Sequence, residues 1–474
     1  MRDLFFLAFL AGMFGIALKR PFLFVLVYAY IDIVSPQRLS YFLLNSIPIS
    51  AIAFVFAFVG WLVFDDKRDS RFSWRQFLML ILLGWCAWTT AHADFPVEAA
   101  SKWDWVWKSL VIAMFLPLTL RTRLRMEALA LVMVLCASTI IVGGGIKTIL
   151  SGGGYGELNL MVENNSGLYE GSTISMVAIA IIPLIFWLAK HGTIFRPGRM
   201  VSLYAVALTG ACLLIPIGTV TRTGLLCIIL LAALVLWHSK KRFAYGAGIA
   251  LLALVSLPFL PSSFTKRMGT IENYQGDQSA STRLEVWKWT LDYVKEHPTG
   301  GGFDAYRSNK FTYNTVRVEG KGGREHVIRE RITEEGRAYH SAYFEILGEQ
   351  GYPGLLIWAL IHIASLTATY RIYRRYKART DAGHAWISPL ALALQQGHLI
   401  YLLGAAFIGV AYQPFIFMML ALEIGLATYL ARLRKQTMFD PIFPRQTRTE
   451  ADDNALPFGG QTPAWSGAMN QEAR

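Results

Sequence analysis

Charged residues are scarce in this chain. Only 16% of its 474 residues are Asp, Glu, Lys or Arg, whereas a soluble domain carries roughly a quarter. Hydrophobic residues make up 54%, and apolar runs long enough to cross a bilayer recur along most of the chain. Because backbone polar groups in lipid must be satisfied within their own segment, and because the runs are continuous rather than alternating, we expect transmembrane helices.

Cysteines and metal-binding motifs are also few. The four cysteines, Cys86, Cys136, Cys212 and Cys227, all fall inside apolar runs, which excludes an extramembrane disulfide and leaves no CxxC pattern for a metal. Neither an HExxH nor a DxD motif occurs on the face that we assign below to the outside. We therefore expect no metal and no other cofactor.

Basic residues gather in short loops that alternate with loops poor in Lys and Arg. Examples are residues 65–75, 190–199 and 371–379, which the positive-inside rule places in the cytoplasm. These loops account for most of the net charge of +13, so we expect no nucleic acid partner. The sequence predicts an all-α polytopic membrane protein with about twelve transmembrane helices, which in a Gram-negative cell would lie in the inner membrane.

The apolar runs give approximate bounds for these helices. Residues 4–35 are ambiguous, since they fit either two short crossings broken at residues 19–21 or one bent element. The other spans are predicted at residues 47–64, 76–92, 104–120, 126–146, 172–190, 201–219, 222–238, 243–260, 352–374, 390–411 and 414–432.

Four regions follow from this pattern. Residues 1–260 and 352–435 are predicted to hold the transmembrane helices. Residues 261–351 form one large loop on the side opposite the basic loops, which is the periplasm in a Gram-negative cell. Residues 436–474 form a polar cytoplasmic tail that we expect to be disordered.

Short helices are expected inside the large loop. Residues 281–303 carry apolar side chains at helical spacing, with Ser281 or Thr282 as the cap and a stop near Pro298. A second helix is expected to follow His340 and to lead into the next span.

Three basic side chains lie at the outer face, where packing in a membrane does not require them. Arg222 is placed at the outer end of a span, Arg283 at the start of the loop helix, and His340 at the junction between the loop and the next helix. An arginine in a membrane is costly unless it is paired, hydrated or serving a ligand, and a cation at a helix N-terminus opposes the helix dipole. Structural explanations stay open for each: interfacial snorkelling, a surface ion pair, and a solvated or capped histidine.

The three residues together fit one ligand chemistry. Two arginines can hold pyrophosphate oxygens bidentately, and neutralising the charge of a pyrophosphate helps it to leave. A histidine near arginines has a lowered pKa, so it is neutral at physiological pH and can act as a general base. Arg222 and Arg283 are therefore predicted to bind pyrophosphate, and His340 to accept a hydroxyl proton.

Five short motifs, in this order, resemble those of the O-antigen ligase and polymerase superfamily of bacterial membrane glycosyltransferases. They are ENNSG (163–167), TRTG (221–224), RLEVW (283–287), HPTGGGFDAY (297–306) and HSAYFEILGEQGYPG (340–354). The resemblance covers about residues 40–435. It implies a GT-C-like fold and metal-independent transfer of a glycan from undecaprenyl pyrophosphate, with lipid tails entering between the spans.

The resemblance also implies roles for individual residues. Arg222 and Arg283 would hold the donor pyrophosphate, and His340 would deprotonate or orient the acceptor hydroxyl, with inversion at the anomeric carbon. Supporting roles are implied for Arg337, Tyr339, Glu345, Asn164 and Asn165. The expected partners are the lipid-linked donor, the acceptor and the membrane lipids.

Four functions are compatible with these features. We prefer the O-antigen ligase, whose acceptor is lipid A–core. The second is a related ligase with another acceptor, because the long N-terminal half resembles ligase-like proteins of exosortase systems, whose acceptor is a protein or another polysaccharide. The third is the O-antigen polymerase. The fourth is a non-enzymatic transporter of lipid-linked glycans, for which ionisable residues near mid-membrane such as His398 and Glu423 are required, although each also fits an interhelical hydrogen bond.

Overall fold

The computed structural model consists mainly of helices. It describes residues 2–41, 43–44, 47–67, 70–150, 167–261, 264–265, 278–319, 326–381 and 383–438. The chain divides into two compact units, Met1–Leu430 and Ala431–Arg474, and the candidate site lies wholly in the first.

The N-terminal helices follow the predicted runs closely. Residues 4–35 form two helices that break at Arg20 and Pro21, and two crossings of the membrane there stay a prediction. Helix α6 begins at Pro96 rather than near residue 104, so the predicted start was wrong; a proline suits the first turn of a helix, where its missing N–H is not needed. The helices are α1 (Arg2–Lys19), α2 (Phe22–Val34), α3 (Pro36–Leu39), α4 (Ile49–Phe64), α5 (Trp74–Ala91), α6 (Pro96–Thr119) and α7 (Arg123–Leu150).

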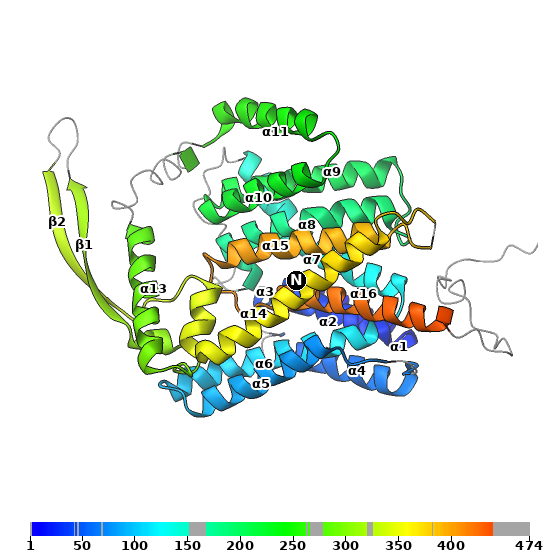
Figure 1. Cartoon of the computed structure of the whole chain (residues 1–474), viewed down its shortest axis with the longest axis horizontal. Helices are drawn as coiled ribbons and strands as arrows, with labels where there is room; N and C mark the ends of the chain where they lie inside the picture. The colour runs from blue at the N-terminus through cyan, green and yellow to red at the C-terminus, as the bar shows by residue number, and fades with distance from the viewer. Residues whose placement is uncertain are drawn as a thin grey trace, which may run out of the picture. The chain divides into compact units, whose positions relative to one another are not determined.

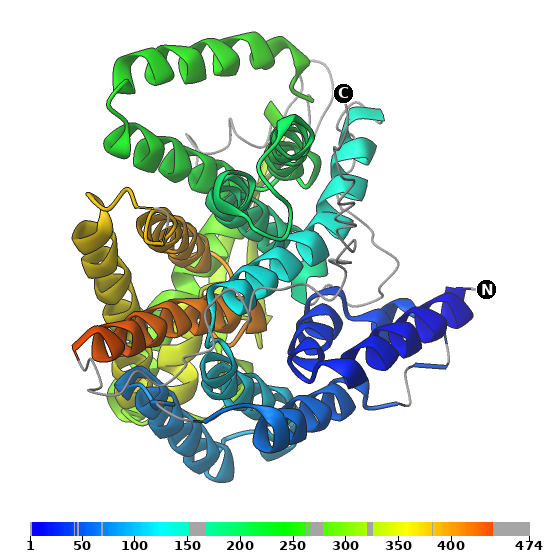
Figure 2. The same cartoon turned by 90° about the vertical axis from the view of Figure 1, so that its right-hand side faces the viewer.

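Helix α8 is, with α16, one of the two most buried of the long apolar helices in the described part of the chain. It packs against α9, α10 and α15, as the view in Figure 2 shows. The elements in this part are the short 3₁₀ turn η1 (Gly167–Tyr169), α8 (Gly171–His191), α9 (Arg199–Gly218), α10 (Arg222–His238), α11 (Arg242–Ser256) and η2 (Leu257–Phe259).

The large loop contains a helix and a β-hairpin. Strands β1 (Lys310–Glu319) and β2 (His326–Glu335) pair antiparallel, with Lys310 opposite Glu335. The all-α prediction was therefore wrong for this segment, where β-branched and aromatic residues recur in β1 and favour a strand. The hairpin extends from the helices beyond α13 (Gln278–Glu296) in Figure 1.

The C-terminal helices begin directly after the loop. Helix α14 (Ala342–Tyr376) contains a break at Gly351, whose φ of 65° belongs to the left-handed region that favours glycine. Helix α15 (Ile387–Ala405) ends six residues before the predicted limit at residue 411, since residues 406–413 form a turn that leads into α16 (Pro414–Met438). That predicted boundary was wrong.

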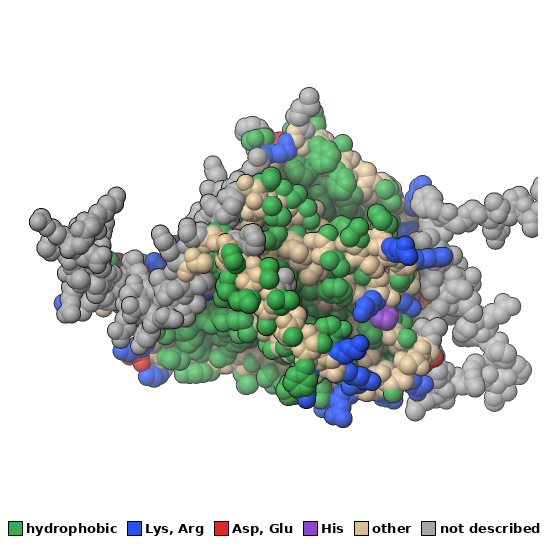
Figure 3. All heavy atoms as spheres, turned by 90° about the horizontal axis from the view of Figure 1, so that it is seen from above, with side chains coloured by type: hydrophobic (Ala, Val, Ile, Leu, Met, Phe, Trp, Pro, Cys, Tyr) green, Lys and Arg blue, Asp and Glu red, His purple; other side chains and the backbone are tan. Residues whose placement is uncertain are grey.

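Five helices among the described residues are long and apolar enough to cross a membrane: α7, α8, α9, α14 and α16. Shorter apolar helices, such as α4 and α10, accompany them. The protein is thus a multi-pass membrane protein, while the total of about twelve spans remains a prediction. On the face in Figure 3, most Lys and Arg side chains gather toward the end of the helices away from the hairpin. All four cysteines are free and buried.

Candidate functional site

His340 lies between the hairpin and α14, in a backbone conformation that side-chain-bearing residues seldom adopt. Its φ is 49°, in the left-handed region. The neighbouring backbone is held on both sides: the indole of Trp287 donates a hydrogen bond to the carbonyl oxygen of Tyr339 at 2.9 Å, and the Asn309 side chain binds both the N–H and the carbonyl oxygen of Arg337, at 2.9 and 2.7 Å. The surrounding structure therefore determines where His340 sits.

Three charged residues act on the pKa of His340. Burial lowers the pKa of His340 below its ordinary value, and the positive charges of Arg283 and Arg337 lower it further. The carboxylate of Glu170 acts in the opposite direction. The imidazole is therefore neutral at physiological pH, which is the form that can accept a proton.

Glu170 fixes the N-terminus of α8 at this position. Its carboxylate accepts hydrogen bonds from the backbone N–H groups of Ser172 and Thr173 and from the Thr173 hydroxyl. Such capping satisfies N–H groups that a helix start otherwise leaves unpaired. No sequence motif points to Glu170, because its role as a cap is recognisable only once the start of α8 is known.

Arg222 begins α10 beside the same end of α8. The turn before it holds Val220 in a left-handed conformation, with φ of 52°. Three hydroxyl groups tie this turn to α8: Ser175, Thr219 and Thr221 lie 2.7 to 3.1 Å from one another. Arg222 is half-buried. The N-terminal turns of α8 thus connect the surroundings of Arg222 with those of His340.

Arg283 belongs to the second turn of α13 and does not begin it. The helix starts at Gln278, so the predicted cap at Ser281 or Thr282 was wrong, and the Thr282 side chain is buried instead. One turn after Arg283, the Trp287 ring stacks on Phe344 of α14, with a centroid distance of 4.8 Å. This contact and the hydrogen bond to Tyr339 attach α13 to the His340 segment.

The residues predicted to support the site have distinct positions. Arg337 forms an ion pair with Glu334 at 3.1 Å. Tyr339 is buried, and its ring lies against Gly348, where an added Cβ would be 2.3 Å from the Tyr339 hydroxyl. Glu345 binds Lys102 at 2.7 Å. Asn164 and Asn165 lie outside the described residues.

A buried group of charged side chains lies behind Tyr339, and it was not predicted as a group. We call it the Lys102 cluster; it consists of Lys102, Asp304, Glu345 and Glu349. The Lys102 ammonium is 2.7 Å from Glu345, 2.6 Å from Glu349 and 3.8 Å from Asp304. The spacing of Glu345 and Glu349 places both on one face of α14, but no sequence signal identifies their partner on α6.

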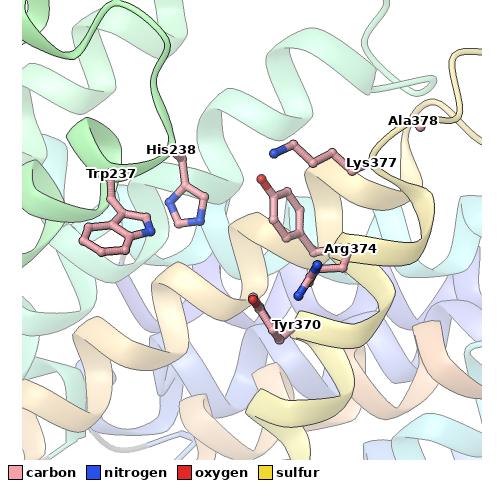
Figure 4. Close-up of a pocket in the computed structure, with 7 residues that line it drawn as sticks. Trp237, His238, Tyr370, Arg374, Lys377 and Ala378 are labelled. Atoms are coloured by element: carbon pink, nitrogen blue, oxygen red, sulfur yellow. The ribbon is translucent and has the colours of Figure 1, made fainter.

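Away from His340, a ligand could bind at a metal-binding cluster or in a pocket of the described residues. In the described part of the chain, no group of three or more His, Cys, Asp and Glu side chains is arranged to hold a metal ion. A basic pocket of about 680 Å³ lies between the last turns of α10 and α14, where His238 faces Tyr370, Arg374 and Lys377 (Figure 4). Because Arg222 and His340 lie at the first turns of these helices, the pocket belongs to the opposite end.

Comparisons with known proteins divide the chain into two parts. Residues 1–193 match a family of unknown function, DUF5935. No curated protein matches the chain. Residues 207–359, which contain Arg222, Arg283, His340 and three members of the Lys102 cluster, match the family described as O-antigen ligase. Residues 207–359 are therefore similar to the O-antigen ligase family, within a multi-pass membrane protein.

Proposed function

We propose that this protein is an O-antigen ligase that transfers a glycan from undecaprenyl pyrophosphate to lipid A–core at the periplasmic face of the inner membrane. The observation that carries the proposal is the grouping of a neutral, half-buried His340 with Arg283 and Arg337, beside the helix end next to which Arg222 begins α10. Two arginines and a base are the parts that a pyrophosphate leaving group and a hydroxyl nucleophile require.

The reaction assigns one task to each residue. Arg222 and Arg283 bind the pyrophosphate oxygens and neutralise the charge that grows as the sugar–phosphate bond breaks. His340 accepts the proton of the acceptor hydroxyl while its oxygen bonds to the anomeric carbon. Undecaprenyl pyrophosphate leaves from the opposite face, so the configuration inverts. No step requires a metal.

An apolar groove supports a lipid-linked donor. It has a volume of about 450 Å³ and is lined by side chains of α8, α9, α10 and α15, among them Phe186, Leu213, Ile228 and Val235. On α10 the lining begins at Ile228, six residues or about 9 Å along the helix from Arg222. On α8 the lining runs from Ile182 to His191, so the groove follows the halves of these helices farther from Arg222, and an isoprenoid chain in it would reach Arg222 only with its pyrophosphate end.

Transfer by purified protein tests the proposal. Wild-type protein and His340→Ala are mixed with undecaprenyl-pyrophosphate glycan and lipid A–core in the presence of EDTA. We expect product from the wild type alone. Equal product from both proteins would show that His340 is not the general base. No product from a folded wild type would contradict the assignment as a ligase that uses lipid A–core.

A related ligase with a different acceptor is the second candidate. It is favoured by the match of residues 1–193 to a separate family, because residues of that segment, such as Glu170 and Lys102, stand against the site. Offering a protein or polysaccharide acceptor beside lipid A–core distinguishes the two. Transfer to the former alone would favour the second candidate.

A further inference from the structure

The Lys102 cluster joins the two parts of the chain that the family comparisons separate. Lys102 lies in the segment matched by the family of unknown function, whereas Asp304, Glu345 and Glu349 lie in the O-antigen ligase domain. Glu349 is fully buried, and the side chains of Lys102 and Glu345 are only 13% and 10% exposed. These contacts are therefore interior ones that solvent screens little.

The composition of the cluster is poorly explained by stability alone. Three carboxylates surround one ammonium group, and Glu349 Oε2 is buried without a hydrogen-bond partner among the described residues. Burial raises the pKa of Asp304, against the lowering effect of Lys102. Apolar side chains of similar volume commonly replace buried ion pairs without loss of stability. Ion pairs and hydrogen bonds are directional, so such a group fixes the relative positions of the elements that carry it, whereas apolar packing does so less.

The geometry that the cluster fixes is the start of α14. Glu345 and Glu349 lie five and nine residues after His340, on the first two turns of the helix, and the Glu345 N–H donates to the carbonyl oxygen of Ser341 at 2.8 Å. The second oxygen of Glu345 accepts a hydrogen bond from the N–H of Ala411 at 3.0 Å. The helix start is thus tied to α6 on one side and to the turn before α16 on the other.

The loop after α13 depends on the same turn of α14. The N–H of Asp304 donates to Glu349 Oε1 at 3.0 Å, and the N–H of Gly302 donates to the backbone oxygen of Glu349 at 2.9 Å. Trp287 of α13 contacts Phe344 and Tyr339. Through these contacts, a shift of the first turns of α14 moves the helix that carries Arg283 as well as His340.

We propose that Lys102 is a positioning residue for the transfer reaction: by holding Glu345 and Glu349, it sets the first turns of α14 and hence the placement of His340 relative to Arg283. The segment of residues 1–193 is then part of the catalytic unit. This inference rests on the proposed function for its activity test, and a second measurement below is independent of it.

A charge-neutral variant separates positioning from folding. Lys102→Met alone leaves buried carboxylates without their cation and is expected to unfold readily. The variant that combines Lys102→Met with Asp304→Asn, Glu345→Gln and Glu349→Gln removes all four charges of the cluster, while the amide oxygens at positions 345 and 349 can still accept from the backbone N–H groups of residues 411 and 304. Lys102→Arg keeps the charge, and Lys108→Met is the matched control, since Lys108 lies on the same helix in an exposed pair with Asp104.

The expected result is a folded neutral variant whose kcat falls by about 10- to 100-fold, because small displacements of reacting groups have effects of this size. Lys102→Arg should retain more of the activity, and Lys108→Met should retain all of it. A folded neutral variant with the wild-type kcat would overturn the proposal, because the cluster would then serve stability alone.

Modification of His340 by diethyl pyrocarbonate supplies the measurement that does not need transfer. We expect the neutral variant, but not Lys108→Met, to change the rate at which the His340 peptide is modified, followed by mass spectrometry. If the wild type transfers no glycan, the proposed function fails. The rate of His340 modification still tests whether Lys102 positions His340. An unchanged rate in the folded neutral variant would overturn the positioning role.

Discussion

Helix α14 carries two buried groups of titratable side chains, and they differ in what they connect. The Lys102 cluster occupies its first two turns and joins α14 to α6, the Asp304 loop and the turn before α16. The second group, which we call the core triad, is His362, His398 and Glu423. It joins α14 to α15 and α16, with His362 and His398 2.7 Å apart and His398 3.0 Å from Glu423.

The difference bears on the choice between an enzyme and a transporter. The core triad contains both residues that a transporter would use near mid-membrane, but they pair with each other, so the interhelical hydrogen bond is confirmed. The Lys102 cluster instead adjoins the segment that holds His340. Charged groups arranged around one helix end favour chemistry at that end, whereas a paired triad between three helices favours packing.

Replacement of the base gives the largest expected effect. His340→Ala should reduce transfer by about 10²- to 10⁴-fold, the range for loss of a general base, without a comparable loss of folded protein. Initial rates of glycan transfer at saturating donor provide the measurement. A rate within twofold of the wild type would contradict the assignment of His340 as the base. The Lys102 cluster would then be no closer to a catalytic residue than the core triad is.

Arg283→Lys should have the next largest effect. Lysine keeps the charge but loses the planar fork that binds two phosphate oxygens, and hydrogen bonds to charged groups contribute about 1.5–3 kcal/mol. We expect kcat/KM for the donor to fall by about 10- to 100-fold. Full activity of this variant would show that a positive charge at position 283 suffices. It would contradict bidentate binding of the pyrophosphate by Arg283.

Disrupting the core triad should affect stability and not transfer. His398→Phe leaves His362 and Glu423 without their shared partner, which is expected to lower the free energy of unfolding by about 1–3 kcal/mol. Denaturation in detergent measures the loss, and transfer per folded molecule should stay within twofold of the wild type. Loss of transfer from fully folded protein would revive a coupling role for the triad.

The smallest expected effect is on the pH profile. Transfer requires neutral His340, so the rate falls as the pH drops through its pKa. Arg337 helps to lower this pKa, together with burial and Arg283, while Glu170 raises it. Arg337→Gln should therefore raise the pKa and move the acid limb of the rate profile to higher pH. A limb that stays in place, or moves to lower pH, would mean that another group controls it.

Much of the fold follows from apolar periodicity. Helices α4, α5 and α7 to α11 lie within a few residues of their predicted bounds, because continuous apolar runs in a membrane allow little else. The hairpin was missed, since a solvated loop lacks the apolar pattern that separates strand from coil. The start of α13 was misplaced because Ser281 and Thr282 resemble a cap although the helix continues before them.

The candidate site can be predicted from the sequence in part. Charge at an outer face and short motifs point to His340, Arg283 and Arg222, whose roles stay predictions. Nothing comparable points to Lys102, because it is 243 residues from Glu345 along the chain and no local pattern records such a pair. Partners that are distant in sequence become visible only when the helices are packed.

The long separation between Lys102 and its carboxylates has a consequence for biogenesis. At the usual rate of synthesis, about 5–20 residues per second, roughly 10–50 s pass between the emergence of Lys102 and that of Glu345. During this interval the ammonium group has to remain hydrated at the surface while further helices insert around it. Assembly of the catalytic unit is therefore a late, post-insertion event, and separately expressed halves divided within the large loop should be able to associate into one active protein.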